Sequence, residues 1–251
     1  MDKNIIWDDF GFFTNNLKNL PVSKSLDLSS KNFCVSTGCS FESWVYYPEK
    51  IINQKDVENV MKFFQEQNIS FMWPVYSEGE DILKNSGLLY AGKLIAMSLS
   101  LKHLNTNMID ATAPVIVDIK QSSGGVEAWA KTAWRGFGGN FDDTPESYFE
   151  LVKSFDECEN FSLYIAKYEN KNAGTFLITH EENLTGVYYF ATVPEFRRKG
   201  IARAMMNEIC RLSGNKTIVL QATPSGFPFY KNFGFKELFE MPIYSTEQDI
   251  F

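Results

Sequence analysis

V-P-E-F-R-R-K-G-I-A-R-A, residues Val193–Ala204, holds an unusual concentration of arginine. The chain has 251 residues, a formal net charge of -7 and five arginines, yet four of these arginines lie between Arg197 and Arg211. The fifth is Arg135. A short basic cluster in an acidic chain indicates a site for a small anion. It does not indicate nucleic-acid binding, which needs a broad basic surface.

The residues around this cluster indicate a strand, a loop and a helix in that order. The segment 184–193 is rich in β-branched and aromatic residues, which favours a strand. Apolar residues then recur at helical spacing, at Ile201, Met205, Ile209 and Leu212. A loop that opens a helix presents unpaired backbone N–H groups at the positive end of the helix dipole, a geometry that binds phosphate. The alternative is a solvated helix start, although basic charge there is unfavourable by about 0.3 to 1 kcal/mol per charge.

The second half of the chain alternates between the two periodicities. We expect strands at 115–119, 161–168, 173–179, 184–193, 217–221 and 235–241, and helices at 125–137, 145–157, 201–212 and 227–232. The joints E-N-K-N and H-E-E-N carry turn residues, so the second, third and fourth strands form an antiparallel meander. The polar stretch 102–114 precedes all of these elements, and we predict a domain boundary within it.

Two segments of the first hundred residues can be aligned with the second half. P-E-K-I-I-N-Q-K-D at Pro48 aligns with P-E-F-R-R-K-G-I-A at Pro194, and L-K-N-S-G-L at Leu83 aligns with Y-K-N-F-G-F at Tyr230. The offsets are 146 and 147 residues, which indicates a duplication. Coincidence among common turn residues is the alternative.

V-P-E-F-R-R-K-G-I-A resembles the R/Q-x-x-G-x-G/A acyl-CoA signature of the GNAT superfamily of N-acyltransferases. F-Y-K-N-F-G-F resembles the Y-x-x-x-G-F segment of the same family, and the resemblance extends from about residue 113 to the end. It implies an α/β fold with a mixed, mostly antiparallel sheet flanked by helices, in tandem. The expected domains are a shortened, degenerate GNAT-like domain at 1–104 and a GNAT acetyltransferase domain at 112–251.

The resemblance also implies which residues bind the acyl-CoA. In such folds the strand before the loop splays from its neighbour, the pantetheine arm lies in the gap, and the pyrophosphate lies on the loop. Backbone groups of Ala191, Thr192 and Val193 would then contact the arm. The phosphates would be held by Arg197, Arg198, Lys199, Gly200, Ile201, Ala202 and Arg203. The loop has neither G-K-S/T nor G-x-G-x-x-G, so it resembles neither a Walker loop nor a Rossmann turn.

Amide formation needs an oxyanion donor, an acid for the leaving thiolate and a base for the amine. The backbone N–H of Val193 is a candidate for the first role. Tyr230 holds the family position for the acid, and the alternative is that its ring packs beside Phe229 and Phe233. Both descriptions are compatible.

The base is not identified by the sequence. The segment 184–193 has no carboxylate, although some family members carry a glutamate there, and the family's common asparagine before Tyr230 is also missing. Candidates by position along the chain are Glu181, Glu182, Asp142, Asp143 and Glu146, with solvated turns, helix caps or a relayed water as alternatives. The glycine-rich segment from Trp134 to Asp143 is either an acceptor-binding loop or an ordinary connection.

The expected reaction is acetyl transfer from acetyl-CoA to a primary amine, of a small molecule or a peptide, by direct attack in a ternary complex. A non-catalytic acyl-CoA-binding or sensor module is the alternative, and a protein-interaction module with vestigial motifs is a third. With four cysteines outside any C-x-x-C spacing and two histidines, we expect no metal. We also expect no nucleic-acid or membrane partner, and a cytoplasmic protein, because the first residues are acidic and no apolar run reaches the length of a membrane span.

The two aligned halves differ at the positions that carry the chemistry. Ile51 stands where Arg197 does, Gln54 stands at Gly200, and Asp56 stands at Ala202. Leu83 replaces Tyr230. The first copy is therefore expected to have lost both the phosphate contacts and the acid.

Overall fold

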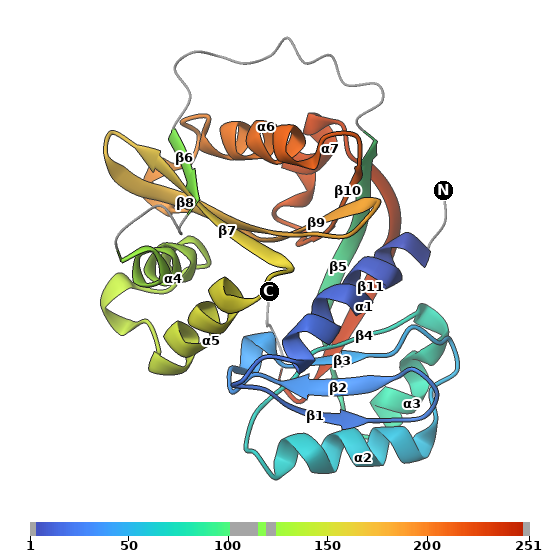
Figure 1. The fold of residues 1–251 in the computed structure, drawn as a ribbon. Helices are drawn as coiled ribbons and strands as arrows, with labels where there is room; N and C mark the ends of the chain where they lie inside the picture. The colour runs from blue at the N-terminus through green and yellow to red at the C-terminus, as the bar shows by residue number, and fades with distance from the viewer. Residues whose placement is uncertain (1–3, 101–114, 119–123, 248–251) are drawn as a thin grey trace. The chain divides into compact units, whose positions relative to one another are not determined.

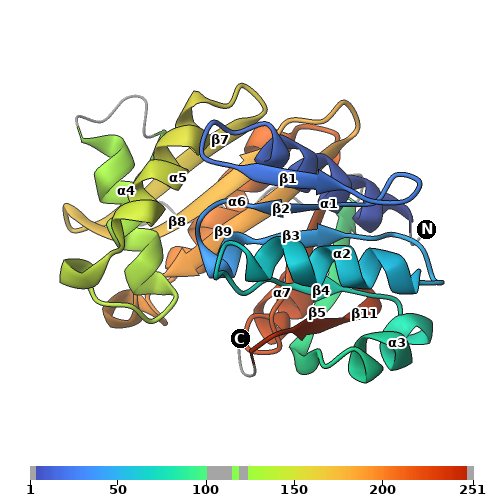
Figure 2. The same cartoon turned by 90° about the horizontal axis from the view of Figure 1, so that it is seen from below.

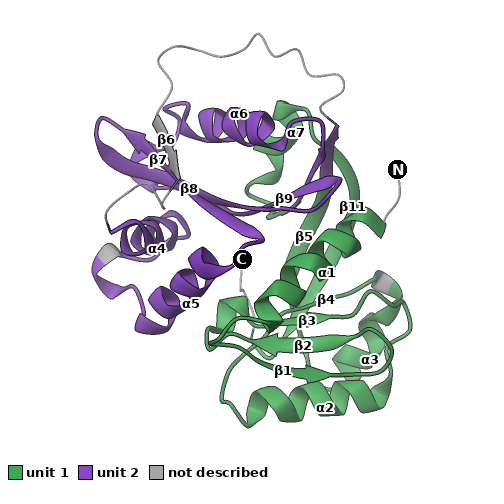
Figure 3. Cartoon of the chain, in the orientation of Figure 1, with its two compact units in different colours: residues 1–97, 221–251 green, residues 98–220 purple. Residues whose placement is uncertain are grey.

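The structure, a computed structural model, describes residues 4–100, 115–118 and 124–247. The chain divides into two compact units, one formed by Met1–Met97 with Gln221–Phe251 and the other by Ser98–Leu220 (Figure 3). The limits of the units fall inside β5 (Leu89–Ser100) and β10 (Thr217–Ala222). The boundary expected within 102–114 lies outside the described residues, and the domain limits 1–104 and 112–251 stay a prediction.

The second unit contains the predicted antiparallel meander. Its strands follow the order β10-β9-β8-β7-β6, and antiparallel pairing joins β6 (Val115–Asp118) to β7 (Phe161–Tyr168), β7 to β8 (Lys171–Thr179) and β8 to β9 (Leu184–Thr192). Helices α4 (Gly125–Gly136) and α5 (Glu146–Glu157) cover one face of this sheet, and α6 (Ile201–Ser213) covers the other (Figures 1 and 2). The predicted and observed bounds agree within about two residues for these elements.

The last part of β9 departs from regular strand geometry. Its register against β8 shifts between Thr175 and Leu177, and Tyr189 has a φ of 49°, a left-handed conformation that is strained for a bulky side chain. The rings around the Tyr189 side chain are those of Trp129, Phe137, Tyr148 and Phe155. Packing against both helices of this face therefore holds the bulge in place.

Strand β9 pairs with β10 over only part of its length. The parallel ladder joins Thr217–Val219 to Leu184–Gly186, while β9 continues to Thr192. This agrees with the splayed pair that the family resemblance implies. The second half of β9 thus has a backbone edge that this ladder does not use.

The first unit contains the first copy together with the last two elements of the second copy, α7 (Phe227–Phe233) and β11 (Lys236–Ser245). It contains α1 (Asn4–Lys18), an antiparallel sheet of β1 (Lys24–Asp27), β2 (Phe33–Ser36) and β3 (Trp44–Tyr46), then α2 (Gln54–Gln65), β4 (Trp73–Pro74), α3 (Glu80–Asn85) and β5, together with α7 and β11. A buried aromatic and aliphatic cluster joins α2 to the strands and includes Tyr47, Phe64 and Trp73.

The spacing of the elements supports the duplication. Helices α2 and α6 start 147 residues apart, and so do α3 and α7, and β5 and β11. The two sequence matches had offsets of 146 and 147 residues. The fold is therefore an α/β fold in tandem with a shortened first copy, as predicted.

Strand β11 lies in the unit formed mainly by the first copy. Its residues Ile243 and Tyr244 pair antiparallel with Pro74 and Trp73 of β4, and the Tyr244 hydroxyl donates to Glu80 at 2.6 Å. Within this unit the strand order is β4-β11-β5. The sequence did not predict that β11 pairs with β4 of the first copy. Among the described residues, no helix combines the length and apolar character needed to cross a membrane.

Candidate functional site

The basic loop connects β9 to α6 through a short 3-10 turn, η6 (Pro194–Phe196). Arg198 and Gly200 have φ values of 63° and 79°, and Gly200 is the N-cap of α6. No side chain caps this helix, and its first turn holds no acidic residue. The first N–H groups of α6 consequently have no intrahelical acceptor and suit an anion.

The loop exposes most of its predicted phosphate-binding residues. Arg197, Arg198, Lys199 and Arg203 are all exposed, and the Lys199 ammonium lies 5.4 Å from the centre of the Tyr168 ring. A β-carbon at Gly200 would meet nothing within 4 Å, so the backbone there is open to a ligand. The side chains of Ile201 and Ala202 are buried and half-buried, which leaves their backbone N–H groups as their possible contacts. These residues fit a phosphate group.

Arg197 differs from the other basic residues of the loop. Its Nε donates to the carbonyl oxygen of Thr192 at 3.2 Å, and its Nη2 donates to the carbonyl oxygen of Gly136 at 3.2 Å. The guanidinium therefore joins the end of β9 to the end of α4.

A second contact joins α4 to the loop. Arg135 Nη2 lies 3.1 Å from Glu195 Oε1, and a β-carbon at Gly136 would lie 2.7 Å from the β-carbon of Ala191. The backbone N–H of Glu195 and the nearby Arg135 and Arg197 lower the pKa of the Glu195 carboxyl. Sequence analysis did not single out Glu195 or Gly136. The one signal in the sequence that could have indicated this contact is that Arg135 is the single arginine outside the cluster.

The backbone groups at the end of β9 make hydrogen bonds that the sequence did not predict. The Val193 N–H donates to Ala173 O at 2.9 Å, and the Val193 carbonyl accepts from the Phe196 N–H at 2.9 Å. Contrary to the prediction, this N–H is already engaged and is not free to stabilise an oxyanion. Because backbone groups alternate along a strand, Ala191 also faces β8. Thr192 faces the opposite edge, where its carbonyl accepts from Arg197.

Tyr230 lies in α7, which belongs to the first unit, whereas the loop belongs to the second. Tyr230 is 8% exposed, and its ring centre lies 5.3 Å from that of Phe229, in agreement with the packing alternative, and 5.6 Å from that of Phe235. Burial raises the pKa of the Tyr230 phenol above its ordinary value, so the phenol keeps its proton at neutral pH.

The carboxylates proposed as bases do not form a common cluster in the described structure. Asp143 accepts hydrogen bonds from the Asn140 side-chain amide at 3.1 Å, from Trp134 Nε1 at 3.1 Å and from the backbone N–H of Asn140 at 2.9 Å, and these bonds lower the pKa of its carboxyl. It is a cap of η5 (Phe141–Asp143), one of the alternatives considered above. Asp142, Glu146 and Glu182 are exposed, and Glu181 is half-buried. Within the described parts of the chain, no three His, Cys, Asp or Glu side chains gather as metal ligands would.

The corresponding helix start of the first copy is satisfied by the chain itself. The Asn53 side chain accepts from the Lys55 N–H at 2.9 Å, and the Tyr47 hydroxyl accepts from the Asn53 N–H at 3.1 Å. Tyr47 in turn donates to the buried carboxylate of Asp56 at 3.0 Å, which also accepts from the Ser29 hydroxyl. An acidic side chain therefore occupies the first turn of α2.

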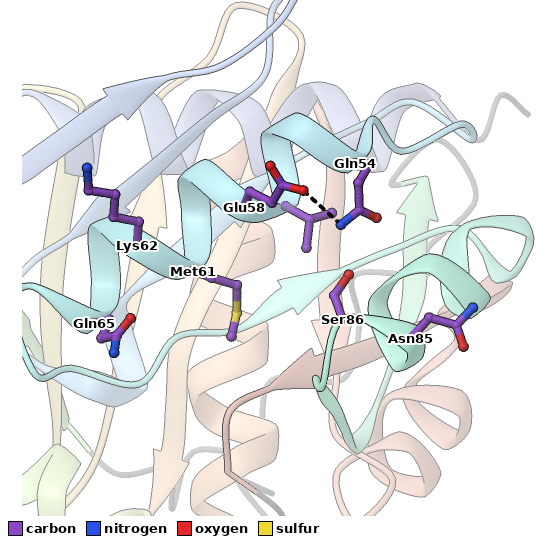
Figure 4. A pocket seen from close by; sticks show the side chains of 8 residues that line it. Gln54, Glu58, Met61, Lys62, Gln65, Asn85 and Ser86 are labelled. Atoms are coloured by element: carbon purple, nitrogen blue, oxygen red, sulfur yellow. Dashed lines mark hydrogen bonds between the residues drawn. The ribbon is translucent and has the colours of Figure 1, made fainter.

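A hollow of about 400 Å³ lies in the first unit beside α2 (Figure 4). Its walls include Gln54 and Glu58 of α2, joined by a hydrogen bond of 3.3 Å, and Asn85 and Ser86 at the end of α3. None of the residues predicted to bind acyl-CoA lines it.

The meander, the splayed parallel pair, the basic loop and the uncapped helix are typical of the GNAT fold. Residues 159–237 match the family described as "Acetyltransferase (GNAT) domain", which includes β7, β8, β9, the loop and α7. The similarity to GNAT acetyltransferases is thus shown for residues 159–237. No curated protein sequence matches the chain.

Solved structures of the same fold cover nearly the whole chain. A GCN5-related N-acetyltransferase from Kribbella flavida is 13% identical, with a TM-score of 0.66 over 96% of this chain and 94% of that one. A conserved protein of unknown function from Staphylococcus epidermidis is 13% identical, with a TM-score of 0.65 over 92% and 97%. A tandem GNAT protein from the clavulanic acid biosynthesis pathway is 8% identical, with a TM-score of 0.61 over 95% and 86%. At such identities these similarities describe the fold alone.

Proposed function

We propose that this protein transfers an acetyl group from acetyl-CoA to a primary amine of a small molecule, peptide or protein, by direct attack in a ternary complex. The amine nitrogen forms a bond to the thioester carbonyl carbon, and the carbon–sulfur bond breaks. The thiolate takes up one proton, and the amine loses one. The cytoplasmic location inferred from the sequence belongs to the same proposal.

The observation that carries the proposal is the difference between two helix starts at equivalent positions. The chain fills the start of α2 with Asn53 and Asp56, but it leaves the start of α6 without a cap or an acidic residue. Basic side chains surround α6 instead, at Arg198, Lys199 and Arg203. Since positive charge at a helix start is unfavourable, an anion such as the CoA pyrophosphate relieves the repulsion.

Thr192 and Tyr230 have distinct proposed roles. Thr192 presents its backbone to the edge of β9 that faces away from β8, where it would contact the pantetheine arm. The protonated phenol of Tyr230 would donate a hydrogen bond to the leaving thiolate. Because its pKa exceeds that of a thiol, complete proton transfer is unfavourable without help from the site.

Thermal unfolding with acetyl-CoA tests the binding step. At a concentration 100 times the Kd, a ligand of the folded state adds about 2.7 kcal/mol to the free energy of unfolding. We expect a rise in Tm with acetyl-CoA, and free thiol released from acetyl-CoA when a panel of primary amines is added. An unchanged Tm would contradict the proposal.

The second candidate is a non-catalytic acyl-CoA-binding module. The observation in its favour is that β9 carries no carboxylate and that Asp143 serves as a cap. This candidate predicts a rise in Tm and stoichiometric binding, with no release of thiol above the background rate for any amine of the panel. Thiol release that depends on the amine would exclude it.

A further inference from the structure

We propose that Arg197 is a positioning residue rather than a phosphate ligand, and that it forms with Arg135, Gly136 and Glu195 a clasp between α4 and the basic loop. The clasp sets the position of the loop on which the CoA phosphates would lie. The proposal rests on the acyl-CoA binding proposed above, and it assigns different roles to neighbouring arginines.

The clasp consists of two contacts, one made by a side chain of the loop and the other by a side chain of α4. Arg197 of the loop reaches α4 and donates to Gly136 O, whereas Arg135 of α4 reaches the loop and pairs with Glu195. All four residues lie in the second unit. Two side chains that each reach across the same junction fix its geometry better than one exposed ion pair, which alone contributes little.

Arg197 is exposed, but its guanidinium already makes two hydrogen bonds within the protein. It donates to two carbonyl oxygens, of Thr192 and Gly136, that belong to different elements. A planar guanidinium presents donors in a fixed fork and can hold both acceptors at once, whereas a lysine ammonium is a single point of charge on a flexible stem. A role in positioning therefore requires arginine itself, while a purely electrostatic role requires only the charge.

Gly136 allows the close approach that the clasp needs. A β-carbon at this position would lie 2.7 Å from the Ala191 β-carbon, so any larger residue would push α4 away from β9. The same residue supplies the carbonyl that accepts from Arg197. The connection after α4 starts here, with the Phe137 and Gly138 N–H groups bonded back to Ala133 O and Arg135 O. The clasp thus ties the start of this connection to the loop.

Substitutions that keep or remove the charge separate the two roles. We expect Arg197→Lys and Arg197→Ala to weaken acetyl-CoA binding by a similar factor, about tenfold, because both lose the fork. At the neighbouring Arg198, we expect Arg198→Ala to weaken binding about tenfold and Arg198→Lys only about twofold, because the charge remains. Arg211→Lys, at the far end of α6, is the control and should bind like the wild type. Calorimetry with acetyl-CoA gives the Kd values.

Hydrogen exchange of the ligand-free protein tests the clasp without any substrate. We expect the Phe137 and Gly138 amides to exchange several-fold faster in Arg197→Lys, and the Ala128 amide at the start of α4 to be unchanged. The double variant Arg135→Glu with Glu195→Arg should restore part of the protection that either single change removes. If wild-type protein failed to bind acetyl-CoA, the proposed function would fall and the exchange data would still decide on the clasp. The proposed clasp would be overturned if Arg197→Lys had the same amide exchange rates and the same Kd for acetyl-CoA as the wild type.

Discussion

Tyr230 combines a family position for the acid with a buried ring. Its phenol keeps its proton, because burial raises its pKa. We predict that Tyr230→Phe lowers kcat at least tenfold and changes the Kd of acetyl-CoA less than twofold, because the ring and its packing against Phe229 and Phe235 are retained.

The measurement is steady-state thiol release together with calorimetric binding. Tyr90→Phe is the matched control, because Tyr90 is 51% exposed in the same unit. Equal turnover of Tyr230→Phe and wild type would remove Tyr230 as the acid and leave it a packing residue.

Arg197 shows why a residue's role is harder to predict than its presence. The sequence places it in a basic cluster, and the family resemblance assigns the whole cluster to phosphate. The direction of one guanidinium depends on the end of α4, which lies about sixty residues away in the chain and leaves no local pattern. The same holds for Val193, whose N–H points toward β8 because of a bulge at Tyr189 that strand periodicity does not reveal.

The two ends of helix α6 offer a matched pair of glycines. Gly200 and Gly214 both have positive φ values, and a β-carbon at either would meet nothing within 4 Å. Alanine at either position should therefore lower the free energy of unfolding through backbone strain, by about 1 to 2 kcal/mol at Gly200 and by more at Gly214, whose φ of 59° and ψ of -116° lie outside the left-handed α region.

Only one of the two changes should affect the ligand. Gly200→Ala distorts the loop at the start of α6, so we predict weaker acetyl-CoA binding, whereas Gly214→Ala should leave the Kd unchanged. Chemical denaturation and calorimetry measure the two effects. Equal Kd values for both variants would show that the start of α6 does not contact the ligand.

The helices and strands themselves were predictable because local patterns specify them. The observed β7 matches its predicted range, and α6 starts at the predicted residue and ends one residue later. Glycines, turn residues and periodic apolar positions are local signals, and the sequence contains them. The pairing of β11 with β4 has no such local signal, because the pattern of β11 indicates a strand but does not indicate its partner strand.

The tandem architecture predicts how many acyl-CoA molecules one chain binds. The start of α2 is filled by Asn53, Tyr47 and Asp56, and Leu83 stands where Tyr230 does. We therefore predict one acetyl-CoA per chain in calorimetry. Changes at Ile51, which is 85% exposed, or at Gln54 should leave the Kd unchanged.

A second acetyl-CoA per chain would contradict this view of the first copy. The variant Arg198→Ala with Lys199→Ala supplies the comparison, because it should weaken the one site without changing the stoichiometry at saturation. If binding at a stoichiometry of one survived that double change intact, the site would have to lie elsewhere.

The position of β11 also has a consequence for the order in which the protein folds. Ile243 pairs with Pro74, although the two residues lie far apart in the sequence. The second unit, by contrast, is one continuous segment from Ser98 to Leu220. During synthesis the second unit can fold as soon as residues 98–220 have emerged. The earlier copy waits for residues 236–245 and meanwhile exposes the edge of β4, and pairings of such sequence separation form slowly. The half that is made first is therefore expected to finish folding last.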